Sequence, residues 1–268
     1  MPHAKVTGHT LYYEEHGTGQ ETIVFAHGLL WSGRMFDAQV NAFKDRYRCV
    51  TFDFAGQGQS EIARDGYDMD SLAADAAALI KQLKVAPCHF AGLSMGGFVA
   101  MRLGIHFPEL VRSLVLLETS ADPEPPENLP KYKLLGFISR WISVRLIVGR
   151  TMQIMFGQTF LNDPARQKQR DEWRGYLLAN NQAGIARALR GVIERQGVYE
   201  MLRKIKTPTL VIVGEEDVAT VPAKAERIAA AIPGAKLVKI PRAGHTSTVE
   251  EPQAVNAAIE QFLATLPR

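Results

Sequence analysis

Short apolar segments alternate with amphipathic segments of helical period along most of this chain. The apolar segments are too short for helices and are rich in β-branched and aromatic residues, which predicts strands. Several lack alternating polar residues, which indicates a parallel sheet covered by helices on both faces. The expected strands are Leu11–Glu15, Thr22–Ala26, Arg48–Phe52, Cys88–Leu93, Arg112–Leu117, Thr209–Val213 and Lys236–Ile240. We therefore predict an α/β fold with a mostly parallel central sheet flanked by helices.

One long segment interrupts this alternation and contains no expected strand. Four prolines, at positions 123, 125, 126 and 130, mark its beginning as a linker. The helices expected beyond them are Leu134–Val148, Thr151–Phe160, Asp171–Asn180 and Ile185–Gln196. We predict one α/β core formed by residues 1–120 and 207–268, with an inserted helical cap, residues 121–206, over one edge of the sheet.

Composition excludes several classes of protein. With 268 residues, 46% of them hydrophobic, the chain can bury a core without a disulfide or metal. Cys49 and Cys88 lack zinc-ligand spacing, and a net charge of +3 is too small to indicate nucleic-acid binding. No apolar run approaches the ~18 residues of a membrane span, and the N-terminal residues do not resemble a signal sequence, so we expect a cytoplasmic protein. We expect neither a metal nor an organic cofactor, and nothing in the sequence indicates an oligomeric state.

A G-x-S-x-G motif, Gly92-Leu93-Ser94-Met95-Gly96, lies between an apolar strand and a helix. A serine hydroxyl is a weak nucleophile, and a tight strand-to-helix turn pushes it out of the sheet toward a base and a substrate. Residues two positions before and after such a serine must be small, which accounts for Gly92 and Gly96. We therefore predict that Ser94 is a catalytic nucleophile.

Two further side chains, Asp217 and His245, follow later strands of the expected sheet. Because the carboxyl ends of parallel strands meet at one edge of a sheet, we expect both side chains near Ser94. The order serine, aspartate, histidine is that of the nucleophile-elbow enzymes. It predicts His245 as the base and Asp217 as the acid that orients the imidazole. Glu215 and Glu216 are alternatives for the acid.

The segment His27-Gly28-Leu29-Leu30 follows an early strand. Acyl transfer places negative charge on a carbonyl oxygen, which two fixed N–H donors can stabilise. The N–H groups of Leu29 and of Met95, at the beginning of a helix, are the predicted donors of this oxyanion hole. His27 could be a second base, but we favour a structural role in holding the loop.

A second glycine-rich segment runs from Asp53 to Ser60 and contains Gly56-Gln57-Gly58. A dinucleotide site would need a third glycine or an alanine near position 61, with a helix beginning there. Glu61 occupies that position and no helix is expected, which argues against a nucleotide cofactor. We expect a tight loop at the rim of the sheet.

Together these motifs resemble those of the α/β-hydrolase family over essentially the whole chain. The matching marks are His27-Gly28, the D-x-x-G-x-G-x-S segment from Asp53 to Ser60, Gly92-Leu93-Ser94-Met95-Gly96-Gly97, Gly214-Glu215-Glu216-Asp217 and Gly244-His245. The resemblance, to the serine esterase and enol-lactonase branch, implies the α/β-hydrolase fold, a Ser94–His245–Asp217 triad and a helical lid. Serine at position 94 differs from the branches with an aspartate nucleophile, the haloalkane dehalogenases and epoxide hydrolases. Ala55 departs from the arginine that many members of the family carry.

The expected cap helices indicate the substrate, because they carry many large apolar side chains. We predict that Phe137, Trp141 and Met155 of the cap, with Trp31 from the core, line an apolar substrate pocket. The chain is therefore predicted to be a carboxylesterase, a serine hydrolase that cleaves esters of short to medium acyl chain.

A basic cap supports an alternative substrate. Residues 121–206 contain 15 Lys or Arg and 8 Asp or Glu, so a basic side chain could bind a substrate carboxylate. This favours a lactone hydrolase like 3-oxoadipate enol-lactonase. A carbon–carbon bond hydrolase or a perhydrolase would use the same triad, and a non-catalytic ligand-binding protein of this fold is a further alternative. If the protein is an esterase or a lactonase, its expected partner is a small-molecule ester or lactone substrate.

Overall fold

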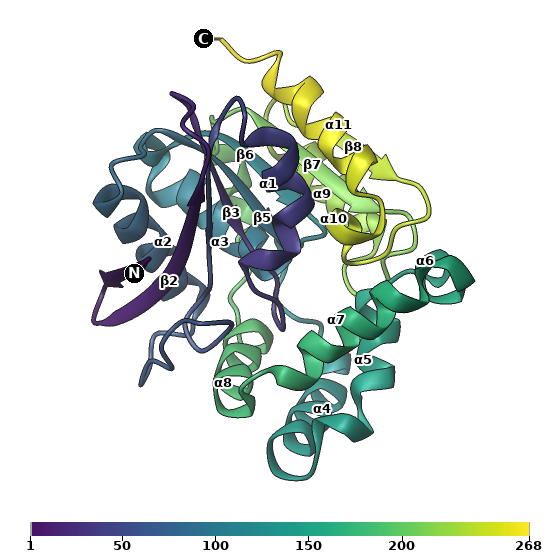
Figure 1. Cartoon of the computed structure of the whole chain (residues 1–268). Helices are drawn as coiled ribbons and strands as arrows, with labels where there is room; N and C mark the ends of the chain where they lie inside the picture. Colours follow the sequence, from purple (N-terminus) through teal and green to yellow (C-terminus); the bar gives the residue numbers. More distant parts are fainter. Residues whose placement is uncertain (1, 268) are drawn as a thin grey trace.

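A twisted sheet of eight strands forms the centre of the protein (Figure 1). The structure, a computed structural model, describes residues 2–267, and the side chains of residues 139 and 140 lie outside that description. The strand order is β1-β2-β4-β3-β5-β6-β7-β8, antiparallel at β1–β2 and β2–β4 and parallel at every later pair. The strands are β1 (His3–Val6), β2 (His9–His16), β3 (Thr22–Ala26), β4 (Arg48–Phe52), β5 (Cys88–Leu93), β6 (Val111–Leu117), β7 (Thr209–Gly214) and β8 (Lys236–Ile240). This confirms the predicted fold class.

Helices cover both faces of the sheet and bury two separate apolar clusters against it. Every residue of β3 is buried, and successive side chains point to opposite faces, so Val24 joins one cluster and Phe25 the other. Helices α2 (Met69–Gln82), α3 (Met95–His106) and α9 (Pro222–Ala231) cover the first face, and α1 (Asp37–Phe43), α10 (Ser247–Glu250) and α11 (Pro252–Leu263) cover the second. Helix α1 and the short strand β1 were not predicted from the sequence.

Between β6 and β7 the chain forms a group of helices that lies at one end of the sheet (Figure 1). These helices are α4 (Leu129–Trp141), α5 (Val148–Met155), α6 (Gln158–Asn162), α7 (Gln167–Ala179) and α8 (Gln182–Ile193).

Short 3-10 helices occur in both the core and the inserted segment: η1 (Gly33–Phe36), η2 (Pro108–Leu110), η3 (Pro126–Asn128), η4 (Val144–Leu146), η5 (Pro164–Arg166) and η6 (Tyr199–Lys204). We call residues 121–206 the cap, and their division from the core stays a proposal.

The expected bounds of the cap helices differ from those observed, most of all for the first two. Helix α4 ends at Trp141 instead of continuing to Val148, and the Ser143 hydroxyl accepts the N–H of Arg145 at the beginning of η4. Extended backbone at Phe156 and Gly157 separates α5 from α6. The Ser143 cap and the extended backbone at Phe156 and Gly157 therefore end helices that the periodic apolar residues predicted to be longer.

Within residues 2–267, no helix is long and apolar enough to cross a membrane. The same residues contain no group of three or more His, Cys, Asp or Glu side chains arranged to hold a metal ion.

Candidate active site

Ser94 forms a strained turn between β5 and α3. Its backbone angles are φ 52° and ψ −108°, a left-handed region that costs a residue with a side chain of order 1–3 kcal/mol. The glycines on either side permit this turn, because a Cβ on Gly92 would lie 2.1 Å from the carbonyl oxygen of Gly96. A Cβ on Gly96 would lie 2.0 Å from that of Ala26. Glycine is therefore needed at both positions, as predicted from the sequence.

A buried hydrogen bond joins the side chains of Asp217 and His245. The Nδ1 atom of His245 lies 2.9 Å from Oδ2 of Asp217, and both residues are almost fully buried. The other carboxylate oxygen accepts the N–H groups of Ala219 and Thr220, at 2.8 and 2.9 Å. Burial alone would raise the pKa of Asp217, but His245 and the hydrogen bonds from Thr220 outweigh it and lower the pKa. Asp217 is therefore ionised at neutral pH, and Nδ1–H of His245 donates to it.

The two glutamates considered as alternative acids lie elsewhere. Glu215 is exposed, and the Glu216 carboxylate accepts the N–H of Thr159 in the cap at 2.8 Å. Of the three candidate acids, Asp217 is the one that is hydrogen-bonded to His245.

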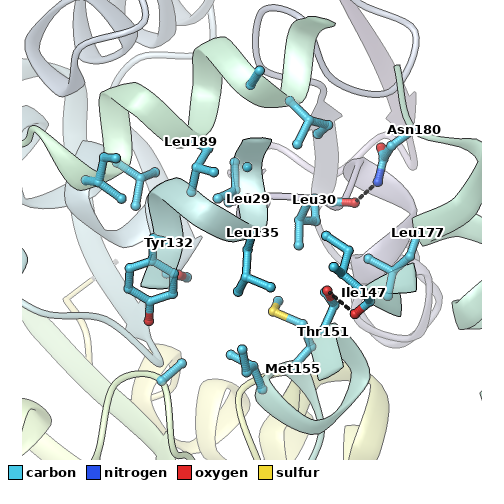
Figure 2. A pocket seen from close by; sticks show the side chains of 18 of the residues that line it. Leu29, Leu30, Tyr132, Leu135, Ile147, Thr151, Met155, Leu177, Asn180 and Leu189 are labelled. Atoms are coloured by element: carbon cyan, nitrogen blue, oxygen red, sulfur yellow. Dashed lines mark hydrogen bonds between the residues drawn. The ribbon is translucent and has the colours of Figure 1, made fainter. Parts of the chain in front are cut away.

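A cavity of about 150 Å³ lies between the core and the cap. Ser94, Leu29 and His245 line it from the core, and Met155 lines it from α5. Figure 2 shows that apolar side chains of the cap point into the same space, among them Leu135, Ile147, Leu177 and Leu189. The structure thus brings Ser94 and the histidine of the Asp217–His245 pair to the wall of one apolar chamber.

The loop after β3 is held by hydrogen bonds from both the core and the cap. The ring of His27 bonds to the carbonyl of Gly28 at 2.7 Å and accepts the N–H of Phe54 at 2.9 Å, which confirms its structural role. Leu30 has φ 76°, its N–H donates to Gln57, and its carbonyl accepts the side-chain amide of Asn180 (Figure 2).

The predicted oxyanion donors are the N–H groups of Leu29 and Met95. Among the backbone–backbone hydrogen bonds that residues 2–267 form outside their helices and strands, none uses either N–H group. Leu29 lines the cavity, and Met95 directly follows Ser94. Their role as oxyanion donors stays a proposal.

Three of the four predicted substrate-binding side chains lie outside this cavity. Trp31 is 2% exposed and packs against Trp173, where it borders a separate, more polar cavity of about 500 Å³. Phe137 and Trp141 are 56% and 69% exposed, because α4 turns its Tyr132, Leu135 and Gly136 side toward the chamber. The prediction was wrong for these three residues, whereas Met155 does line the cavity.

A buried ion pair lies at the chamber wall, where the two ends of the cap meet. Arg195 contacts Glu124 at 2.9 Å, and their side chains are 2% and 9% exposed. Arg195 also donates to the carbonyl of Asp122 and stacks over Phe98. Nearby, the N–H of Val198 donates to the carbonyl of Ala121 at 2.7 Å. We call these contacts between residues 121–124 and 195–198 the neck of the cap.

Two residues of the site, Thr220 and Glu250, were not predicted from the sequence. The Thr220 hydroxyl donates to Asp217 at 2.7 Å and lies 3.3 Å from Nδ1 of His245. Its position three residues after Asp217 was an available signal, because an aspartate often binds backbone and hydroxyl groups two or three residues further on. Glu250 accepts hydrogen bonds from both residues that flank His245, and no local pattern indicated this role.

A serine at a strand-to-helix turn and a buried Asp–His pair, on a mostly parallel sheet, define the class of the protein. Residues 23–258 match the sequence profile of the "Alpha/beta hydrolase family", and the chain belongs to that family.

The chain is similar to three relatives over nearly its whole length. It is 31% identical to a proposed non-heme bromoperoxidase, BpoC, of Mycobacterium tuberculosis, over 96% of this chain and 98% of that protein. The structure of a thermophilic esterase from Thermogutta terrifontis matches with a TM-score of 0.89 and 29% identity, covering 98% of this chain and 97% of the other. That of the enol-lactonase from Burkholderia xenovorans LB400 matches with a TM-score of 0.91 and 26% identity, covering 98% and 100%.

Proposed function

We propose that this protein is a serine hydrolase that cleaves uncharged carboxylic esters of short to medium acyl chain through an acyl-enzyme on Ser94. The observation that carries the proposal is that His245, hydrogen-bonded to Asp217, lines the same apolar cavity as Ser94. The similarity to an esterase and an enol-lactonase supports ester-bond chemistry.

The proposed reaction begins with proton transfer. Because Nδ1–H of His245 donates to Asp217, its Nε2 is free to take the proton of the Ser94 hydroxyl. The serine oxygen attacks the ester carbonyl, and the N–H groups of Leu29 and Met95 bind the oxyanion. His245 then gives its proton to the leaving alcohol, and Asp217 stabilises the imidazolium while it exists.

The acyl-enzyme is then hydrolysed by the same groups in the reverse order. His245 takes a proton from a water molecule, which attacks the acyl carbonyl. The oxyanion forms again at Leu29 and Met95, and the Ser94 oxygen leaves with the proton from His245. The carboxylic acid is released and the enzyme returns to its starting state.

The chamber favours an uncharged acyl group. A cavity of about 150 Å³ can hold a hydrocarbon about the size of benzene. The charges of Arg195 and Glu124 at the wall neutralise each other, so a substrate carboxylate placed there would have to compete with Glu124 for Arg195. This disfavours the enol-lactonase alternative, whose substrate would need a cationic partner.

Activity on p-nitrophenyl esters should rise with acyl length up to about six carbons. Each added methylene buried in the chamber contributes about 0.8 kcal/mol, which is about fourfold in kcat/KM. Beyond the length that the chamber accommodates, kcat/KM should decrease toward the palmitate ester. A series from acetate to palmitate measures this dependence, and a maximum at acetate would contradict an acyl pocket in this cavity.

A matched pair of substrates separates the two candidate functions. We expect kcat/KM for p-nitrophenyl hexanoate to exceed that for the mono-p-nitrophenyl ester of adipic acid by about 10²-fold or more, because the free carboxylate must lose its hydration in an apolar chamber. The two substrates have the same acyl length and leaving group. Faster hydrolysis of the adipate ester, together with rapid turnover of an enol-lactone, would favour a lactonase.

A further inference from the structure

Glu250 is a buried carboxylate that the proposed reaction does not use. It is fully buried at the end of α10, five residues after His245. Its Oε2 accepts the N–H of Gly244 at 3.0 Å, and its Oε1 accepts the N–H of Thr246 at 3.0 Å. One carboxylate therefore binds the backbone on both sides of His245.

The same carboxylate also binds the cap. Oε2 of Glu250 accepts the N–H of Gly157 at 2.8 Å, at the turn between α5 and α6. The Thr246 hydroxyl donates to the carbonyl of Met155 at 2.7 Å, so a second bond joins the same two segments. They lie in direct contact, since a Cβ on Gly244 would lie 2.2 Å from the nitrogen of Gly157.

We propose that Glu250 is a positioning residue, which fixes His245 and at the same time fastens the histidine loop to the cap turn at Gly157. This inference rests on the proposed function, in which His245 is the base. Met155, which precedes this turn, lines the substrate chamber. One carboxylate thus sets both the position of the cap segment around Gly157 and the orientation of His245.

The charge of Glu250 supports this role. Burial raises the pKa of Glu250 to about 7, although its three N–H partners lower it. The carboxyls of Asp217 and Glu118 are its charged neighbours from the core, and from the cap Arg166 donates to the backbone carbonyl of Glu250. Three N–H donors bind the ionised form more strongly than the protonated form. Protonation below about pH 7 therefore weakens these three hydrogen bonds and at the same time removes the cost of the buried charge.

The test compares Glu250→Gln with Glu251→Gln. The glutamine has nearly the same shape but only one acceptor oxygen, so at least one of the three N–H groups loses its partner. Glu251 is the matched control, because it joins Arg166 of the cap to the core without binding the backbone beside His245. At pH 8 we expect kcat of Glu250→Gln on p-nitrophenyl hexanoate to decrease by about 10²-fold with KM changed less than about threefold. We expect Glu251→Gln to stay within about threefold of wild type.

Two further measurements distinguish positioning from general structural support. The acid limb of kcat in Glu250→Gln should contain one ionisation fewer than that of the wild type. Hydrogen exchange should be faster in residues 155–160 and 243–248 of Glu250→Gln, while the melting temperature stays within about 4 °C of wild type. Because folding raises the pKa of Glu250 to about 7, the stability of the wild type should fall as pH rises from the pKa of an unfolded glutamate to about 7. Glu250→Gln has no carboxyl at this position and should not show this loss.

Two results would overturn the proposal. One is a kcat of Glu250→Gln within about threefold of wild type, and the other is an equal loss in Glu251→Gln. Failure of the proposed function is a separate outcome, in which the wild type neither hydrolyses esters nor reacts with a fluorophosphonate at Ser94. Hydrogen exchange would then still decide whether Glu250 fastens the loop to the cap, and unchanged exchange would reject that contact.

Discussion

Replacing Ser94 with alanine is expected to lower kcat on p-nitrophenyl hexanoate by on the order of 10³-fold or more. The alanine retains the small side chain that the strained turn accepts but has no oxygen to form the acyl-enzyme. The residual rate would come from the oxyanion donors and from binding alone. Steady-state kinetics measure the loss, and a fluorophosphonate followed by mass spectrometry tests the nucleophile directly, since the wild type should gain one adduct and the variant none.

Ser120 provides the control for this variant. It is a buried serine just after β6, at the same carboxyl edge of the sheet, and its hydroxyl accepts the N–H of Asp122. Ser120→Ala should keep kcat within about threefold of wild type. Undiminished turnover by Ser94→Ala would remove Ser94 as the nucleophile.

Replacing Asp217 with asparagine is expected to lower kcat by about 10⁴-fold, the scale found when the same change alters the tautomer of a catalytic histidine. The reason lies in the partners of the carboxylate. The N–H groups of Ala219 and Thr220 donate to Oδ1, so the asparagine carbonyl oxygen would take that position. Its NH₂ group would then face Nδ1 of His245, which would have to accept a hydrogen bond. The proton would move to Nε2, where the base needs a free lone pair.

The control for this variant is Glu215→Gln, which changes an exposed carboxylate on the same loop and should leave kcat unchanged. Measurement of kcat over a pH range separates the loss of the base from a shifted optimum. If Asp217→Asn retained activity while Glu216→Gln lost it, the acid would have to be reassigned.

Much of the fold was predictable because its signals are short-range. The strands β3, β5 and β7 are buried along their whole length, and a run of apolar residues bounded by turns is a direct sign of such a strand. The loops that carry Ser94 and His245 follow from the rule that sites of parallel sheets lie at the carboxyl ends of strands. Local sequence was therefore enough to predict these strands and the loops that carry Ser94 and His245.

The lining of the chamber could not be predicted in the same way. Helix α4 carries apolar residues around much of its surface, and its period does not say which side faces the core. Leu135 faces the chamber while Phe137, two residues later, faces solvent. The Glu250–Gly157 contact joins residues 93 positions apart, and such pairs are set by tertiary packing and not by local pattern.

The neck of the cap has a consequence for how this architecture can diverge. Glu124 and Arg195, near the two ends of the inserted helices, already bind each other, as do the backbones of Ala121 and Val198. Because the two ends of the cap are bound to each other, the helices between them can be exchanged while the α/β core keeps its structure. A chimera that grafts a relative's helices between these two anchors should acquire that relative's acyl preference, provided that the incoming helices keep a backbone N–H for Glu250.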